Sequence, residues 1–392
     1  MFNNFEEFEN WLDISKNFDG DTIRFVYKFI DKFPNATVED YIKCAEKLTK
    51  GVPIEEIMAR YKRHMASIGE NEEDEFFEVS ELDEKLEEMV AQMKTGLLKG
   101  STTYVDIIDD CWKWRLGEFS LLTGYNNDGK SLLIRFLCLI KGIMDKWPSA
   151  IYAPEDYPAT AFFDELIHTA SGYSTDKDNY GYIGEDLYRK VAGQITGLIK
   201  YVNVRPPKNT IQNVLKMFIP LIEKKGVKIC IIDPLIKLTR PDKYVNNDAA
   251  WVLYLQTICT DFARRYNVAL ILVLHQLTPK LQENGTYMKP DKYSIKYGGN
   301  FADGADNVLF LQKPDAPKDN KSTLVRFGSL KIKKQKLVAT PHEVMFRFNR
   351  KTNRYIYEHE DRDIFDFDKV LELPRATFNF TLKSEHDDDR PF

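Results

Sequence analysis

Residues 124–131 carry two glycines, a lysine and a serine in the arrangement G-x-x-x-x-G-K-S. In such a segment the glycines let backbone N–H groups turn toward phosphate oxygens, Lys130 reaches the β and γ phosphates, and the hydroxyl of Ser131 ligates Mg²⁺. The pattern predicts a site for ATP and Mg²⁺, and the alternative is a chance glycine turn with a solvated lysine. The residues expected to bind the nucleotide are Gly124, Tyr125, Asn126, Asn127, Asp128, Gly129, Lys130, Ser131 and Leu132.

Two elements must position this segment. Residues 118–123 form an apolar run that predicts a buried strand, and residues 131–147 have the pattern of a helix. A helix that begins at Ser131 directs the positive end of its dipole toward a bound anion. The order of strand, glycine loop and helix favours the nucleotide site over the chance turn.

Two acidic residues at predicted strand ends are candidates for the chemistry of ATP hydrolysis. That reaction needs a carboxylate that organises Mg²⁺ and a base that orients the attacking water. Asp233 ends an apolar strand and suits the metal-organising role, while Glu155 ends the strand that follows the phosphate-binding helix. Ligands of parallel sheets bind outside the carboxyl ends of the strands, so both acids are suitably placed. The alternatives are a strand-capping acid at Asp233 and a plain surface acid at Glu155.

Polar residues and lysine-bearing loops follow two further predicted strands. His275 and Gln276 follow the strand at 269–274, where a polar side chain could sense the γ phosphate. A lone histidine there is otherwise a satisfied core residue. The long loop at 278–300 and the shorter loop at 239–247 are candidates for function, because long loops in compact domains are usually functional or disordered. Their basic residues, whose alternative is a solvated face, are Arg240, Lys243, Lys280, Lys289, Lys292 and Lys296.

Composition limits the class of protein. The chain has 392 residues, 43% of them hydrophobic and 29% charged, which is enough for about two or three domains. A formal net charge of −5 argues against a surface that coats nucleic acid throughout, but is compatible with a local basic channel. No apolar run could span a bilayer and the first residues do not resemble a signal peptide, so we expect a cytoplasmic protein without membrane contact. The five cysteines lack C-x-x-C pairing, which predicts reduced, buried thiols.

The pattern changes along the chain and predicts four regions. Residues 1–68 have the apolar spacing of a small helical domain, and residues 69–100 combine an acidic linker with an amphipathic helix at 80–98. Residues 101–360 predict an α/β domain with a mostly parallel sheet and an antiparallel extension, and the acidic tail at 361–392 is expected to be disordered. The predicted strands are 119–123, 150–153, 201–204, 227–232, 269–274 and 308–311, followed by 323–327, 330–337, 344–348 and 354–357.

Five short segments, taken in order, resemble the hexameric RecA-type replicative DNA helicases, DnaB-like and especially Twinkle-like, including members from phages. The resemblance covers roughly residues 100–357. The ordered set is far more specific than any one of its members. The segments are 117–131, 152–158, 204–207, 226–234 and Lys334-Gln-Lys336.

This resemblance implies a RecA-like P-loop ATPase core that acts as an ATP-driven helicase, translocating 5′ to 3′ on single-stranded DNA as a homo-hexameric ring. It implies that Glu155 polarises the attacking water and that Gln276, with His275 beside it, senses the nucleotide. The two lysine-bearing loops would line a central channel and grip the DNA backbone. Lys334 and Lys336 match a pair of basic residues on a late strand that enters the ATP site of the neighbouring subunit.

Two positions depart from the family pattern. The family has arginine where Lys336 stands, and a lysine can stabilise transition-state charge but lacks the planar fork of arginine. Asp128 stands where the family has small or neutral residues. A carboxylate that pointed toward the polyphosphate would weaken nucleotide binding, and we expect this one to point outward.

Both ends of the chain suggest contacts with other proteins. The acidic terminus, Asp387-Asp-Asp-Arg-Pro-Phe392, is similar to phenylalanine-terminated tips that dock into basic pockets on replication proteins, and the alternative is a solubilising tail. The candidate partners are a polymerase and a primase, which would be a separate protein because residues 1–68 lack zinc and primase motifs. The helix at 80–98 occupies the place of the family's linker helix, which docks on the adjacent subunit.

Two other functions stay open on the sequence. One is a RecA-type recombination ATPase that forms filaments, and the other is an ATP-dependent loader or assembly module that never translocates. The linker helix and the late lysine pair favour the ring over the filament. The loader predicts ATPase activity that is indifferent to single-stranded DNA.

Overall fold

The computed structural model describes residues 99–374, apart from 179–180 and 297–299, together with four helical residues, Leu86, Val90, Met93 and Lys94. These four fall within the predicted linker helix. The predicted helical domain at 1–68, the acidic linker, the rest of the linker helix, and residues 375–392 with Phe392 lie outside the described residues. The described residues from Met93 onward belong to one compact unit, Ala91–Phe392.

The described chain forms a nine-stranded sheet in the order β3-β2-β4-β5-β1-β6-β7-β8-β9. Neighbouring strands from β3 through β6 in this order pair in parallel, and β7, β8 and β9 continue the sheet with antiparallel pairing. The predicted α/β class and the antiparallel extension are therefore confirmed. The strands are β1 (Phe119–Thr123), β2 (Ser149–Tyr152), β3 (Ile199–Val202), β4 (Ile229–Ile232), β5 (Ala269–Val273), β6 (Asn307–Gln312), β7 (Leu324–Ile332), β8 (Glu343–Asn349) and β9 (Arg354–Tyr357).

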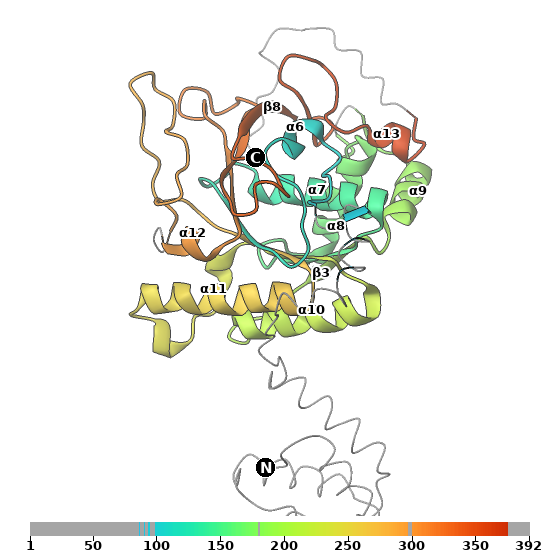
Figure 1. Ribbon diagram of the computed structural model, residues 1–392. Helices are drawn as coiled ribbons and strands as arrows, with labels where there is room; N and C mark the ends of the chain where they lie inside the picture. Colours follow the sequence, from blue (N-terminus) through green and yellow to red (C-terminus); the bar gives the residue numbers. More distant parts are fainter. Residues whose placement is uncertain are drawn as a thin grey trace, which may run out of the picture. The chain divides into compact units, whose positions relative to one another are not determined.

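Helices cover both faces of this sheet, as the crossover connections of parallel strands require. In Figure 1, α7 and α8 lie on one side of the sheet, and α10 and α11 lie on the other. Alternate residues of β1 enter the two cores, Leu122 on the α7 side and Leu121 on the α11 side, because successive strand residues point to opposite faces. The helices are α6 (Asp106–Asp109), α7 (Lys130–Asp145), α8 (Ala159–Ser171), α9 (Glu185–Ile195), α10 (Ile211–Lys225), α11 (Asp248–Arg265), α12 (Asn300–Gly304) and α13 (Phe367–Val370), with 3-10 turns η2 (Leu235–Lys237) and η3 (Asp242–Tyr244).

Helix α7 connects the phosphate-binding segment to the core. It begins at Lys130, directly after Gly129, whose φ of 89° lies in the left-handed region that favours glycine. Its apolar residues are almost all buried, because it packs between the sheet and the neighbouring helices. It ends at Asp145, two residues before the predicted end, and Lys146 adopts a left-handed conformation at the C-cap.

Two predictions about the late part of the domain are wrong. The separate strands expected at 323–327 and 330–337 are one strand, β7, which ends at Ile332. Lys334 and Lys336 therefore lie in a turn, where the N–H groups of Leu337 and Val338 donate to the carbonyl of Lys334, both at 3.0 Å. The register with β6 ends at Ile332, so nothing extends the strand through the lysines.

The packed domain also extends past the boundary expected at 360. Phe367 at the start of α13 is fully buried, and Ile364 and Leu371 are nearly so. The acidic residues of this segment are not all solvated, because Arg354 pairs with Asp363 at 3.0 Å and with Asp368 at 2.8 Å. The segment at 361–374 thus packs onto the core through its apolar residues and is not a disordered tail.

Two smaller predictions can be compared with the structure. The four described cysteines are buried free thiols, as expected, namely Cys111, Cys138, Cys230 and Cys259. Among the described residues, no helix combines the length and apolarity needed to cross a membrane.

Candidate nucleotide site

A pocket of about 550 Å³ lies at the carboxyl edge of the parallel strands. It is formed by the loop between β1 and α7, the first turns of α7, and the residues that follow β2, β4 and β5. The sequence predicted this meeting point, because the carboxyl ends of parallel strands lie at one edge of a sheet. The pocket is lined by Asn126, Asn127, Gly129, Lys130, Ser131, Leu132, Arg135, Glu155, Asp156, Glu165, Asp233, Pro234 and His275.

Lys130 is held inside this pocket by the loop that precedes it. Its Nζ donates to the carbonyl oxygens of Tyr125 at 2.6 Å and Gly124 at 3.2 Å. Burial lowers the pKa of Lys130, and the nearby carboxylates of Asp128, Asp233 and Glu155 oppose that shift. A buried cation among carbonyls and backbone N–H groups is suited to bind a phosphate group.

Gly124 is required by a close approach of two backbones. A Cβ at this position would lie 2.2 Å from the carbonyl oxygen of Leu311 in β6, which no real side chain tolerates. The first glycine of the loop therefore lets the chain pass against β6. It supports the loop from behind and does not line the pocket.

Asp128 is buried, and its carboxylate points neither to solvent nor into the nucleotide pocket. Its Oδ2 accepts the backbone N–H of Tyr125 at 2.7 Å, and its Oδ1 accepts the backbone N–H of Lys313 at 3.2 Å. Burial raises the pKa of Asp128 to about 6, although both hydrogen bonds and the charges of Lys130 and Lys313 oppose that shift. The carboxylate accepts hydrogen bonds from the loop and from the chain after β6. It therefore links these two segments and does not line the pocket.

Ser131 and Asp233 form the candidate Mg²⁺ site. Asp233 is buried directly after β4 and accepts a hydrogen bond from the Ser131 hydroxyl, while its Oδ2 has no hydrogen-bond partner. Burial raises the pKa of Asp233 to about 6, and the positive charge of Arg135 opposes this shift. A hydroxyl beside a buried carboxylate oxygen fits Mg²⁺, which takes few protein ligands and completes its shell with phosphate and water.

No group of three or more histidine, cysteine, aspartate or glutamate residues within the described part of the chain could hold a metal ion by itself.

Glu155 lies after β2 on the wall of the pocket, with about half of its side chain exposed. Its Oε1 is 3.0 Å from Nζ of Lys237, which stands at the end of η2. Glu155 and Lys237 also line a second pocket of about 370 Å³ beside the first. The side chain of Glu155 therefore faces the space in which a ligand would lie.

His275 and Gln276 follow β5 and differ in their surroundings. Gln276 is buried, and its Nε2 donates to Oγ1 of Thr123 at 3.2 Å and to the carbonyl of Asp291 at 3.0 Å. His275 lines both pockets, and burial followed by the charge of Lys130 lowers its pKa, which favours the neutral imidazole. Gln276 therefore joins the end of β1 to the long loop at 278–300.

The described part of that loop, residues 278–296, is folded against the nucleotide site and contains no helix or extended strand. An antiparallel bridge joins Leu281 to Tyr287, and another joins Gln276 to Ile295. The hydroxyl of Tyr125 donates to the carbonyl of Met288 at 3.1 Å. The loop thus forms a hairpin that contacts the phosphate-binding loop directly.

The predicted DNA-binding residues of this hairpin occupy different places. Lys296 lines the smaller pocket with Glu155, whereas Lys289 pairs with Glu343 at 2.7 Å. The ammonium of Lys292 lies 4.8 Å from the ring centroid of Tyr293, which is 65% exposed. Lys280 is also exposed at the base of the hairpin.

The shorter loop carries a second group of cations beside aromatic rings. Arg240 pairs with Asp248 at 2.6 Å and lies 5.8 Å from the ring of Trp251. Lys243 is exposed and lies 4.7 Å from the ring of Tyr244 and 5.6 Å from that of Tyr254. Tyr244 and Tyr254 stack with centroids 5.0 Å apart.

Lys334 and Lys336 lie outside both pockets, and both are exposed in the turn after β7. The sequence also missed four charged residues that line the two pockets, Arg135, Asp156, Glu165 and Lys237. A signal for Arg135 was present, because it follows Ser131 by four residues and so shares its face of α7. The pairing of Lys237 with Glu155 depends on the sheet topology and had no local signal.

No protein-family model matches the sequence, and no curated protein matches it. Comparison with solved structures, in contrast, finds proteins of similar fold. A solved ATPase domain is similar with a TM-score of 0.57 and 16% sequence identity, covering 70% of this chain and 98% of that domain. A DnaB-like replicative helicase, solved in a study of its interactions with primase, has a TM-score of 0.57 and 14% identity, covering 84% of this chain and 87% of its own. The described domain therefore shares its fold with these two proteins.

Proposed function

We propose that this chain is an ATP-dependent DNA helicase motor of the DnaB-like replicative type. The observation that carries the proposal is the convergence of Lys130, Ser131, Asp233 and Glu155 on one pocket at the carboxyl edge of the sheet. Phosphoryl transfer to water requires side chains that stabilise negative charge, bind Mg²⁺ and orient the attacking water, and these four can perform those tasks. The fold alone would not assign this activity, because one fold can serve many functions.

The roles of the residues follow from their positions. Lys130 leaves its loop carbonyls to contact the β and γ phosphates, and the N–H groups at the start of α7 face the same anion. Ser131 and Asp233 would hold Mg²⁺, which neutralises charge that develops on the phosphates. Glu155 orients and polarises the attacking water, and Lys237 holds this carboxylate in place until the substrate is bound.

A ring of subunits would supply further positive charge to each nucleotide pocket. Lys130 is the one lysine among the described residues that line the larger pocket, and Lys334 and Lys336 are exposed in a turn away from it. In a closed ring with head-to-tail contacts, this turn can enter the site of the next subunit and stabilise the transition state. We infer a closed ring on this basis, and the resemblance to hexameric helicases suggests a homo-hexamer.

Single-stranded DNA is the proposed track. Its backbone would contact Arg240, Lys243, Lys280, Lys292 and Lys296, next to aromatic rings on which bases can stack. Gln276 connects the hairpin at 278–300 to the end of β1, so a change at the γ phosphate can reach the DNA contacts. Lys289, paired with Glu343, must break that ion pair to contribute.

Other replication proteins are proposed as partners. A DnaB-like helicase of similar fold was solved in a study of its interactions with primase, which supports a primase as partner here. The acidic tail that ends in Phe392 is the proposed contact for a primase or a polymerase. Such a motor would work in the cytoplasm, that of the host if the chain is encoded by a phage.

Unwinding of a forked duplex tests this function, with particle images recorded for the same samples. The native chain should unwind the fork in the presence of ATP and Mg²⁺ and should form rings. Glu155→Gln should bind nucleotide but fail to unwind, because the variant lacks the base. Unwinding by this variant would remove Glu155 from the mechanism, and filaments in place of rings would favour a recombination ATPase.

The second candidate function is an ATP-dependent loader. The dependence of its ATPase rate on single-stranded DNA would distinguish it from a helicase. A loader would hydrolyse ATP at the same rate with and without single-stranded DNA, since it never moves along the strand. The cationic and aromatic residues of the two loops favour the helicase.

A further inference from the structure

Arg135 is buried on α7 among three carboxylates. Only 5% of its side chain is exposed, and its guanidinium contacts Asp156, Glu165 at 2.6 Å and Asp233 at 3.9 Å. The ring of Phe162 covers one face of the guanidinium, with its centroid 4.9 Å away. The group lies in the wall of the nucleotide pocket.

We propose that Arg135 is a positioning residue that fixes both acids of ATP hydrolysis, the Mg²⁺ ligand Asp233 and the turn that carries Glu155. The proposal deepens the function proposed above and rests on it. Arg135 would act through these acids and would not contact the reacting atoms. It adds to the site a residue that neither the phosphate-loop motif nor the strand ends indicate.

The contact with Asp156 reaches the base through the backbone. Asp156 is the neighbour of Glu155, and its carboxylate is held by Nη2 of Arg135. The hydroxyl of Tyr201 donates to the carbonyl oxygen of Asp156 at 2.8 Å, which fixes the same residue from β3. The side chain of Asp156 is held by Arg135 and its backbone carbonyl by Tyr201. These two contacts therefore fix the orientation of the neighbouring Glu155.

The contact with Asp233 concerns the metal. Asp233 uses one oxygen toward Ser131, and its Oδ2 lies 3.9 Å from Nη2 of Arg135, too far for a hydrogen bond. The guanidinium therefore compensates the charge of Asp233 without occupying that oxygen. This leaves Oδ2 available for Mg²⁺ or its water.

The shape of arginine is needed for this arrangement. Nη1 donates to Glu165, and Nη2 faces both Asp156 and Asp233, so the two arms of the planar fork serve acids on three different segments. A lysine at the same place has a single ammonium group and cannot keep three carboxylates at their separate positions. Lysine should therefore restore charge but only part of the geometry.

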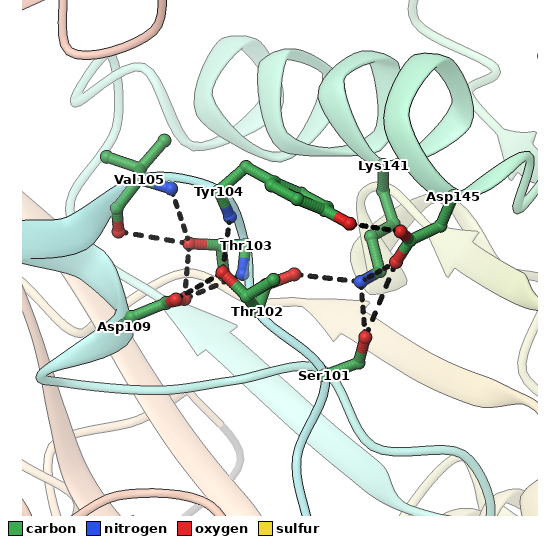
Figure 2. Close-up of polar contacts among 8 residues, drawn as sticks. All are labelled: Ser101, Thr102, Thr103, Tyr104, Val105, Asp109, Lys141 and Asp145. Atoms are coloured by element: carbon green, nitrogen blue, oxygen red, sulfur yellow. Dashed lines mark hydrogen bonds and ion pairs between the residues drawn. The ribbon is translucent and has the colours of Figure 1, made fainter. Parts of the chain in front are cut away.

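Lys141 provides a matched control on the same helix. It is also a buried cation of α7, paired with Asp145, and its Nζ donates to Oγ of Ser101 at 2.6 Å and the carbonyl of Thr102 at 2.8 Å. Figure 2 shows these contacts, which join α7 to the segment at 101–105 and do not include any pocket residue. Lys141→Gln removes a buried charge from α7 without touching the site.

The experiment compares the native chain with Arg135→Gln, Arg135→Lys and Lys141→Gln. For each protein, binding of a fluorescent ATP analogue is measured with Mg²⁺ and with EDTA, and kcat and KM for ATP are measured with single-stranded DNA. Thermal unfolding is recorded for all four. The binding arm does not require hydrolysis, so it tests Arg135 even if the native chain proves not to be a helicase.

Arg135→Gln should lose most of the gain in nucleotide affinity that Mg²⁺ gives, while binding in EDTA changes by less than about twofold, because Lys130 is untouched. Its kcat should fall by about tenfold to a hundredfold, the range seen when partners of metal ligands are removed, with a smaller change in KM. Arg135→Lys should recover part of both losses.

Lys141→Gln should lower the unfolding temperature but keep the native response to Mg²⁺ and the native kcat. A response to Mg²⁺ in Arg135→Gln equal to that of the native chain would overturn the proposal. So would equal losses in Arg135→Gln and Lys141→Gln, because they would show that any buried charge of α7 has the same effect. Failure of DNA to stimulate the native ATPase would contradict the helicase instead.

Discussion

Oδ1 of Asp128 accepts the backbone N–H of Lys313 at 3.2 Å, which joins the phosphate-binding loop to the chain directly after β6. The same carboxylate accepts the N–H of Tyr125 inside the loop. An acid next to the nucleotide pocket thereby has a structural role. The two backbone N–H groups compensate the charge of its carboxylate.

Asp128→Asn should change how stability depends on pH. Burial raises the pKa of Asp128 from 3.8 to about 6, so the native state binds this proton more tightly than the unfolded chain does. The stability from this group is complete below pH 3.8 and is lost as pH rises through about 6. At 1.36 kcal/mol per pH unit the loss is up to about 3 kcal/mol.

The variant does not titrate at this position, so its free energy of unfolding should gain on that of the native chain between about pH 4 and 7. Urea unfolding at several pH values measures the difference. Asp242→Asn, which removes a carboxylate from an exposed position in η3, serves as the control. A difference between Asp128→Asn and the native chain that stays constant over this range would contradict the buried, titrating carboxylate.

Lys336 should act on the neighbouring subunit. Lys336→Ala should lower DNA-stimulated ATP hydrolysis by about a hundredfold or more, because charge on the transferred phosphoryl group loses a partner. Lys336→Arg should keep the activity or raise it, since the guanidinium can bind two phosphate oxygens.

Mixing two inactive variants decides whether this contact crosses between subunits. Lys336→Ala keeps an intact pocket and Lys130→Ala keeps an intact Lys336, so mixed rings contain some complete sites. Hydrolysis should reappear in the mixture at a fraction of the native rate. If the mixture is as inactive as its components, the turn does not serve the next subunit.

Arg354→Met should destabilise the domain strongly. This arginine is 2% exposed, pairs with Asp363 and Asp368, and donates to the carbonyls of Thr169 and Ala170. Removing the guanidinium leaves two partly buried carboxylates without their partner, and breaking a buried ion pair in this way costs about 3–5 kcal/mol. Urea unfolding should show this loss, whereas Arg362→Met, at an exposed arginine of the same region, should be close to the native chain. Similar losses in both variants would argue against the buried network.

Lys243→Ala and Lys280→Ala should weaken binding of single-stranded DNA and reduce its dependence on salt. Each lost phosphate contact lowers the slope of log K against log salt by about 0.7. Fluorescence anisotropy at several salt concentrations measures the slope. Lys216→Ala, at an exposed lysine of α10 outside both loops, should keep the native slope. Unchanged slopes in the two loop variants would exclude these loops as the DNA contact.

The sequence predicted the parallel core well because its strands are short apolar runs with clear ends. The bounds expected for β1 through β6 agree with the structure to within two residues. Glu155 and Asp233 could be placed at one pocket because the carboxyl ends of parallel strands share an edge of the sheet.

Other features depend on contacts between distant residues and had no local pattern. The turn at Lys334 was predicted as strand because lysines alternate with apolar residues from Leu330 to Lys333, and only the end of pairing with β6 shows that the strand stops at Ile332. The packing of α13 depends on Arg354, whose charge compensates an acidic segment that otherwise resembles a tail. Asp128 could not be oriented because its partner, the N–H of Lys313, follows it by 185 residues.

ATP hydrolysis by the purified native chain, measured with Mg²⁺ in the presence and absence of single-stranded DNA, is the most direct test of the account. We predict hydrolysis that DNA stimulates severalfold and that Lys130→Ala abolishes. A chain that hydrolyses no ATP under either condition would contradict the proposed motor.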